Sequence, residues 1–302
     1  MPGAARIVNA LLALPPVAAA AKRAGGIDHR RGLPRFAPIT FRRWFARRAD
    51  AAAGPEAAAS AARPPVLLWV DTFTDHFSPE VGRAAVRVLE DAGYAVELPE
   101  AAVCCGLTWI STGQLDGARR ELRRTLDALE PALRAGTPIV GLEPSCLAVL
   151  RGDAVDLLPG DRRAVQARES VRTLAELLAG TEGWHAPDLT GVRGVAQPHC
   201  HHHAVLGWQA DARLLAEAGA EITAVGGCCG LAGNFGVEQG HYEVSAAVAG
   251  AALLPAVAAA GDEDLVLADG FSCRTQLEHL SERRGIHLAQ LLADRLGPRP
   301  AE

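Results

Sequence analysis

The stretch GGCCGLAGNFG at residues 226–236 contains a Cys-Cys-Gly triplet, and a second Cys-Cys-Gly triplet occupies residues 104–106. A disulfide needs two cysteine side chains that converge, which neighbouring residues rarely provide. Two adjacent thiolates can instead bind one metal centre. A cysteine pair that recurs in matching surroundings therefore predicts a metal site inside a duplicated unit.

Strands and helices are predicted to alternate from residue 66 onward, and the series runs twice. The first series has strands at 66–70, 95–98 and 138–142 and helices at 79–92, 116–134 and 164–179. The second has strands at 192–196, 221–225 and 265–268 and helices at 211–218, 244–260 and 286–296. A repeat of three strands and three helices is longer than the unit of a solenoid protein. It fits a duplicated α/β domain. The predicted fold class is therefore α/β, a duplicated Rossmann-like domain of two Cys-Cys-Gly (CCG) repeats with an N-terminal basic helical arm.

The charge is distributed unevenly along the chain. The net charge is −5, but residues 1–50 carry ten Lys or Arg against two Asp, so the remainder is strongly acidic. We predict a basic helical arm at 1–50, a linker rich in Ala, Pro, Gly and Ser at 51–64, a first cysteine-rich repeat at 65–185 and a second at 186–302. A basic arm on an acidic body favours docking on a partner or an anionic surface, and no basic stripe with interleaved aromatics predicts nucleic-acid binding.

The arm itself leaves two interpretations open. Phe41, Trp44 and Phe45 have helical spacing and arginines beside them. This pattern fits an amphipathic helix that packs on its own body, and equally a helix that docks on a partner. Upstream, the apolar segment 7–21 is divided by Pro15 and Pro16, which predicts a short broken helix rather than a signal peptide.

The cysteine count predicts a reducing compartment. Seven cysteines, four of them in adjacent pairs, do not suit a disulfide framework, and thiolates kept for metal are typical of the cytoplasm. No apolar run of 18 residues predicts a membrane span. We therefore expect a cytoplasmic protein, whose basic arm would allow peripheral attachment at the inner face of the membrane.

The second repeat has four cysteines, and each follows a predicted strand, where open α/β sheets bind their ligands. Four thiolates suit a [4Fe–4S] cluster or a structural zinc ion. Glycines such as Gly230 let the backbone approach the metal closely and donate N–H groups to sulfur. The four cysteines are Cys200, Cys228, Cys229 and Cys273.

Four histidines surround the first of these cysteines. Adjacent side chains diverge on a regular backbone, so we expect at least two of the four to be solvent-exposed. One of the others, with His199 and His201 as the candidates, is expected to hydrogen-bond a metal-bound sulfur, carry protons or act as a ligand. The four are His199, His201, His202 and His203.

The first repeat has three cysteines, Cys104, Cys105 and Cys146. They could hold zinc with His76 or Asp75 as a fourth ligand, or they could be the remnant of a lost cluster site. No glycine-rich phosphate loop and no GxGxxG motif follows a strand, so the sequence predicts no nucleotide or flavin site on this chain.

The cysteine stretches carry a family resemblance. Residues 70–82 (VDTFTDHFSPEVG), 104–106, 143–146, 197–200, 228–236 and 268–276 (ADGFSCRTQ) resemble the CCG-type cysteine-rich domain. That domain occurs in heterodisulfide reductase, in anaerobic glycerol-3-phosphate dehydrogenase and in the iron–sulfur module of FAD-linked glycolate and D-lactate dehydrogenases. Against the family pattern, Thr72, Glu143 and Gly270 stand where the domain has cysteines.

The resemblance implies an iron–sulfur electron-transfer module of a flavin-dependent 2-hydroxyacid dehydrogenase of the glycolate or D-lactate type. It implies one [4Fe–4S] cluster on this chain and FAD on a partner chain or further domain. It also implies a ferredoxin-like iron–sulfur partner and a quinone or another carrier as electron acceptor. The chain alone is not expected to oxidise the acid. Two alternatives remain open, a thiol–disulfide redox module like heterodisulfide reductase and a zinc-stabilised assembly module.

Overall fold

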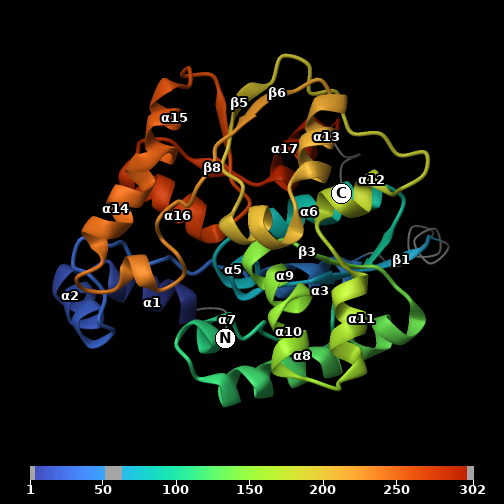
Figure 1. Ribbon diagram of the computed structural model, residues 1–302, viewed down its shortest axis with the longest axis horizontal. Coiled ribbons are helices and arrows are strands. Elements are labelled where there is room, and N and C mark those ends of the chain that lie inside the picture. Colours follow the sequence, from blue (N-terminus) through green and yellow to red (C-terminus); the bar gives the residue numbers. More distant parts are fainter. Residues whose placement is uncertain (1–3, 52–62, 298–302) are drawn as a thin grey trace.

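The computed structural model describes residues 4–51 and 63–297. Most of the predicted linker, residues 52–62, lies outside the described residues. From residue 65 onward the chain folds into two halves, each built around its own parallel sheet (Figure 1).

The two sheets have the same strand order, which confirms the predicted duplication. In the first half the order is β2-β1-β3-β4, and in the second it is β6-β5-β7-β8, with every neighbouring pair parallel. Chain order reverses between β1 and β3 and again between β5 and β7, which makes these two positions the ligand-binding switch points of the sheets. The strands are β1 (Pro65–Trp69), β2 (Ala95–Glu97), β3 (Ile139–Gly141), β4 (Val171–Arg172), β5 (Arg193–Ala196), β6 (Glu221–Ala224), β7 (Leu265–Leu267) and β8 (Gly285–Ile286).

Helices connect the strands in both halves. In the first half they are α5 (Thr72–His76), α6 (Pro79–Asp91), α7 (Leu107–Ser111), α8 (Leu115–Ala135), α9 (Pro144–Arg151), α10 (Asp153–Leu157), α11 (Arg162–Ser170) and α12 (Leu174–Ala179). In the second half they are the π-helix η1 (His202–Leu206), α13 (Gln209–Glu217), the 3₁₀ turn η2 (Phe235–Val237), α14 (Tyr242–Ala251), α15 (Leu253–Ala259), α16 (Phe271–Leu280) and α17 (Leu288–Arg295).

Three predicted helices differ from the observed ones. The helix predicted at 164–179 is two helices, because Val171 and Arg172 pair with β3 and Thr173 then begins α12 with a capping box. The helix predicted at 286–296 begins later, because β8 pairs with β7 first. The helix predicted at 244–260 breaks at Ala252, whose φ of −143° is not helical.

The largest hydrophobic cluster of the described residues spans both halves. It joins Val86 and Leu89 of α6 to Leu288 and Leu292 of α17, and α6 packs directly on α17. Burial of apolar surface of both halves in one cluster holds them together as a unit. The carboxyl ends of β1 and β3 therefore keep a fixed position relative to the helices of the second half.

The basic arm packs on this body. It contains α1 (Ala4–Leu12), α2 (Pro15–Ala24) and α3 (Phe41–Ala51). The Phe41 side chain is fully buried, and its ring fills the space above Gly82, where a Cβ would lie 2.5 Å from Phe41 Cδ2. The backbone N–H of Arg42 donates to Asp75 Oδ1 at 2.9 Å. Of the two interpretations of this helix, the structure supports packing on its own body.

Within residues 4–51 and 63–297, no single helix has both the length and the apolar composition needed to cross a membrane. Two bent helix pairs, α1 with α2 and α14 with α15, reach that length and composition only when taken together.

Candidate metal centre

The four cysteines of the second half meet at the carboxyl end of its sheet. Cys200 follows β5, Cys228 and Cys229 follow β6, and Cys273 lies in the first turn of α16 after β7. Since β6, β5 and β7 are parallel neighbours, their following loops lie at the same edge. Cys200 and Cys273 flank the switch point between β5 and β7.

The four thiols lie in a row in which each influences the ionisation of the next. Cys200 contacts Cys228, Cys228 contacts Cys229, and Cys229 contacts Cys273. Hydrogen bonds from the Cys200 and Cys229 thiols, with one from Gly230 N at 3.3 Å, lower the pKa of Cys228 to about 2. Donation to Cys228, with burial, raises the pKa of Cys200. Of the four thiols, Cys228 is therefore the one that readily loses its proton. A metal cation that binds the four would displace the protons of the other three.

Gly230 is required by this turn. Its φ is +85°, and a Cβ there would lie 2.1 Å from the backbone oxygen of Ser245. The absence of a side chain lets the backbone pass close to α14 while its N–H points at Cys228 Sγ.

We predict that Gly230→Ala destabilises the protein by more than about 2 kcal/mol, because it combines a left-handed φ with a backbone clash. The iron content of this variant should fall together with its stability. Gly226→Ala is the matched control, since a Cβ at Gly226 meets no atom of the described residues within 4 Å. Urea denaturation and iron analysis of both variants measure the effect, and equal stabilities would contradict it.

His199 is buried between the two switch-point loops. Its Nδ1 accepts from His201 N at 3.2 Å, so Nε2 carries the proton and faces Ser272 Oγ at 3.2 Å. Burial, together with the nearby His201, lowers the pKa of His199 to about 4. The imidazole is therefore neutral, and its Nδ1 lies 3.9 Å from Cys200 Sγ.

His199 also occupies the room next to Gly270. A Cβ at Gly270 would lie 2.4 Å from His199 Cδ2 and 3.4 Å from Cys273 Sγ. The family pattern has a cysteine at this position, so the histidine ring fills the space that a side chain at 270 would need. Of the remaining histidines, His203 is exposed, His201 is half-buried and His202 is buried. The expectation that at least two of the four would be solvent-exposed is wrong.

The cysteines of the first half lie at the equivalent sheet edge. Cys104 and Cys105 follow β2, and Cys146 lies in the first turn of α9. Cys105 Sγ is 3.2 Å from Cys146 Sγ, and Gly106 N donates to Cys104 Sγ at 3.4 Å. The hydrogen bond to Cys105, with burial, raises the pKa of Cys104. The hydrogen bond from Cys105 favours the thiolate of Cys146, but burial and nearby negative charge outweigh it and raise the pKa of Cys146 to about 11.

In the first half, two carboxylates lie at or next to positions where the family pattern has cysteines. Asp71, next to Thr72, accepts from Phe73 N at 2.8 Å and from Thr74 Oγ1 at 2.6 Å, which caps α5. Burial, followed by the charge of Glu143, raises the pKa of Asp71. Both carboxylates are close enough to Cys146 to disfavour its thiolate. The two carboxylates thus disfavour a further negative charge at Cys146.

The predicted fourth ligands have other partners. Asp75 accepts from the backbone of the arm, and its Oδ2 lies 3.5 Å from His76 Nε2. Among the described residues of the first half, no three His, Cys, Asp or Glu donor atoms lie within 4.8 Å of one another.

The two cysteine sites adjoin across the boundary between the halves. The ring of Phe73 stacks on that of Phe271 with centroids 4.5 Å apart, and Phe271 N donates to Glu143 Oε2 at 2.8 Å. Helix α9, which carries Cys146, packs on η1, which begins just after Cys200. Glu143 thus serves both sites, accepting from Ser145 Oγ in one half and from Phe271 in the other.

One functional residue was not identified from the sequence. Arg31 of the arm is 2% exposed and donates to Gly236 O, Gln276 Oε1 and Ser245 Oγ, each at 2.7 Å. These partners form the wall behind Gly230. Nothing in the sequence distinguishes Arg31 from the other basic residues of the arm, because its partners lie more than 200 residues away in sequence.

Residues 71–151 match the family model described as "CCG: Cysteine-rich domain". This segment is similar to the CCG cysteine-rich domain. The matched segment includes Cys104, Cys105 and Cys146. The second half repeats the strand order of the first half and its Cys-Cys-Gly triplet.

Two curated relatives resemble the whole chain or part of it. The C subunit of anaerobic glycerol-3-phosphate dehydrogenase from Escherichia coli K12 is 29% identical over 297 residues, which is 97% of this chain and 72% of the relative. Lactate utilization protein A of Bacillus velezensis is 28% identical over 186 residues, which is 58% of this chain and 75% of the relative. The first match spans both halves as well as the arm.

Proposed function

We propose that this protein is an iron–sulfur electron-transfer module of a flavin-dependent dehydrogenase. The observation that carries the proposal is the chain of four thiols, Cys200, Cys228, Cys229 and Cys273, at the switch point of the second sheet. Thiolates are the ligands of iron–sulfur clusters, and a cluster bound there would supply one-electron chemistry.

The spacing of the thiols supports a cluster over a single zinc ion. Four sulfurs on a tetrahedral zinc lie about 3.8 Å apart, given Zn–S bonds of about 2.3 Å. In the described chain no three of these thiol sulfurs lie within 4.8 Å of one another. A cluster spreads its ligands over several irons, so the more extended set fits it better.

The residues around the thiols would tune the potential of the bound group. Gly230 N–H points at Cys228 Sγ, and a hydrogen bond to a ligating sulfur stabilises the reduced form. The neutral His199 adds polarity without charge, and burial of Cys229 and Cys273 keeps water away. These are the contributions that a protein makes when the cofactor carries the redox chemistry.

In this proposal the first half is a degenerate site that holds neither a cluster nor zinc. Asp71 and Glu143 already accept hydrogen bonds at the N-termini of helices. Their charges disfavour further negative charge at Cys146. A second complete cluster would add negative charge beside two buried carboxylates, which is costly.

The partners proposed here follow from the chemistry of the site. The sequence has no nucleotide-binding motif, so FAD would be bound by a partner chain or a further domain that oxidises a 2-hydroxyacid of the glycolate or D-lactate type. The relatives are named as a glycerol-3-phosphate dehydrogenase subunit and a lactate utilization protein, which supports a dehydrogenase context. Electrons would arrive directly or through a ferredoxin-like protein and leave to a quinone, with the module in the cytoplasm or attached at the inner face of the membrane.

The proposal is tested by mixing the anaerobic protein with photoreduced FMN and then with a soluble quinone. We expect the visible absorbance to bleach by one electron per chain and to recover when the quinone is added. Failure to bleach, or failure of the quinone to restore the colour, would refute the electron-transfer role.

One observation favours a second candidate, thiol–disulfide chemistry. Cys105 Sγ and Cys146 Sγ lie 3.2 Å apart, close enough to form a disulfide after a small movement. Protein first oxidised to a Cys105–Cys146 disulfide should, on this candidate, take up two electrons in the same titration and release two thiols per chain, counted with a thiol reagent. One-electron uptake without new thiols would exclude it.

A further inference from the structure

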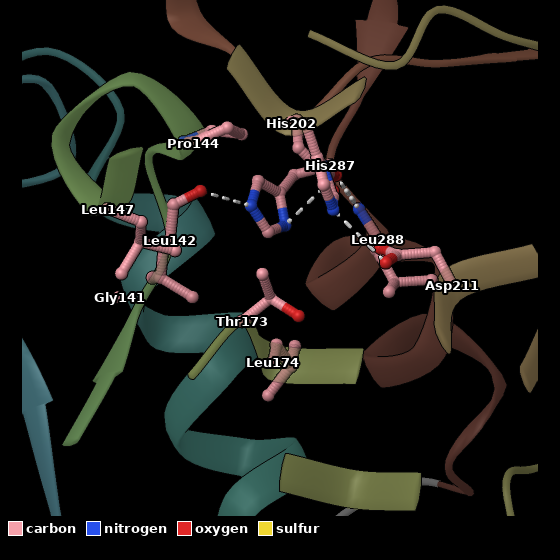
Figure 2. Close-up of a pocket in the computed structure, with 11 residues that line it drawn as sticks. Gly141, Leu142, Pro144, Leu147, Thr173, Leu174, His202, Asp211, His287 and Leu288 are labelled. Atoms are coloured by element: carbon pink, nitrogen blue, oxygen red, sulfur yellow. Dashed lines mark hydrogen bonds and ion pairs between the residues drawn. The ribbon is translucent and has the colours of Figure 1, made fainter. Parts of the chain in front are cut away.

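A second cluster of donor atoms lies inside the second half, apart from the cysteines. His202, Asp211 and Asp269 each bring one ligand atom into a group whose members all lie within 4.8 Å of one another. His202 Nε2 is 3.2 Å from Asp211 Oδ2. Figure 2 shows the His202 and Asp211 side chains converging beside His287 at the boundary between the halves.

The polar atoms of this group are buried and incompletely satisfied. The side chains of His202 and Asp211 are each 2% exposed. Within the described part of the chain, neither ring nitrogen of His202 nor Asp211 Oδ2 has a hydrogen-bond partner, so their 3.2 Å approach is not aligned as a hydrogen bond. Buried polar groups without partners are rare, and each one calls for an explanation such as an ion or a water.

The neighbouring His287 lines the site, and its Nδ1 lies 3.6 Å from Asp269 Oδ1. Its Nδ1 accepts from Ala289 N at 2.9 Å, and its Nε2 donates to Leu142 O at 3.0 Å, so both nitrogens are used. Asp269 Oδ1 accepts from Leu288 N at 2.8 Å, and a carboxylate has a second oxygen available for a cation.

The local space fits a single ion. A cavity of about 10 Å³ adjoins the group, lined also by Leu142, Pro144 and Thr173 of the first half. This is close to the room that one water molecule or one bare cation needs. His202 projects from a π-helix, a rare element that is frequent at functional sites.

We propose that His202, Asp211 and Asp269 bind one divalent first-row cation of the zinc class. One imidazole and two carboxylates are nitrogen and oxygen ligands that suit such ions, and the positive charge would compensate two carboxylates in a buried setting. A water would complete the coordination. This site is distinct from the thiols in both donor type and position.

The proposed ion would join the two loops that carry the cysteines at the switch point. His202 lies two residues after Cys200, and Asp269 lies four residues before Cys273. Bound to both, together with Asp211 of α13, the cation would hold the loops at a fixed separation. Its role is therefore structural, as a support for the neighbouring site.

Cobalt is the probe that separates this site from the cysteines. Co²⁺ held by nitrogen and oxygen shows weak visible bands without the intense sulfur-to-cobalt charge transfer that thiolates give. The full chain, with its iron and sulfide content measured first, is treated with a chelator at a strength that leaves the iron bound. It is then titrated with Co²⁺, desalted and analysed for metals.

We expect one equivalent of Co²⁺ in the wild type, with bands free of sulfur charge transfer. The Asp211→Asn variant should lose that equivalent with unchanged iron content. Glu217→Gln, which changes an exposed carboxylate on the same helix, should bind as the wild type does. No cobalt uptake by the wild type, or equal uptake by wild type and Asp211→Asn, would overturn the proposal.

A substitute variant and a spectral criterion complete the test. If Asp211→Asn fails to fold, Asp269→Asn serves in its place, because Asp269 is the least buried of the three. A cobalt-minus-untreated difference spectrum dominated by sulfur-to-cobalt charge transfer would also overturn the proposal. Iron is measured in the same samples, so a failure of the cation site is distinguishable from a failure of the electron-transfer role.

Discussion

Cys228→Ser is expected to abolish iron binding, from about four atoms per chain to none. Gly230 N donates to Cys228 Sγ, and the neighbouring thiols of Cys200 and Cys229 lower the pKa of Cys228, so it is the thiolate on which the donor set is centred. A serine hydroxyl is a poor ligand for iron–sulfur clusters, and the remaining three thiols would lose their central acceptor. Iron and sulfide analysis of anaerobically purified protein measures the loss.

The matched control is Cys104→Ser, the equivalent position of the first half. Gly106 N donates to Cys104 Sγ just as Gly230 N donates to Cys228 Sγ. We expect this variant to keep its iron, since the first half is proposed to hold none. Iron retained by Cys228→Ser, or lost equally by both variants, would contradict the assignment of the cluster to the second half. Circular dichroism of both variants checks that neither loss reflects unfolding.

Arg31→Ala is expected to destabilise the protein by about 3 kcal/mol. The substitution removes three charge-assisted hydrogen bonds, and each buried partner left unsatisfied costs about 1–3 kcal/mol. Ser245 keeps one bond, because Gln276 Nε2 donates to its Oγ at 3.0 Å, which limits the total. The free energy of unfolding from urea titration measures the loss.

Arg47→Ala provides the comparison for Arg31, because Arg47 is an exposed arginine of the same arm. We expect it to change stability by less than about 0.5 kcal/mol. Arg31→Ala should also bind less iron, since Ser245 O supports the Gly230 turn. A shift for Arg31→Ala no larger than that for Arg47→Ala would show that the arm is not part of the structure behind the site.

The main strands and the gathering of the cysteines could be predicted from the sequence. Short apolar runs such as 66–70 and 265–268 are typical of buried parallel strands, and cysteines placed after such strands must meet at one edge of the sheet. The two-residue strands β4 and β8 could not be predicted, because so short a segment has no periodic pattern. Pairing with a central strand alone defines them.

The contribution of the arm and of the buried histidine could not be read from local patterns. The ten basic residues favoured docking on a partner or an anionic surface, and the spacing of the aromatic residues left packing on the body equally open. In the structure Phe41 and Arg31 are buried against distant parts of the chain. No role was predicted for His202, but a π-helix directs it inward to Asp211. Both cases depend on tertiary contacts between residues that sequence spacing does not relate.

The central claim is that the second half holds one iron–sulfur cluster, and its most direct test is the analysis of protein purified without oxygen. Iron, acid-labile sulfide and zinc are measured together, with visible and electron paramagnetic resonance spectra before and after dithionite. The account predicts about four iron and four sulfide per chain and a brown absorbance that bleaches on reduction. Zinc at the thiols with no sulfide, and no dithionite-dependent spectrum, would contradict it and identify the protein as a zinc-stabilised assembly module.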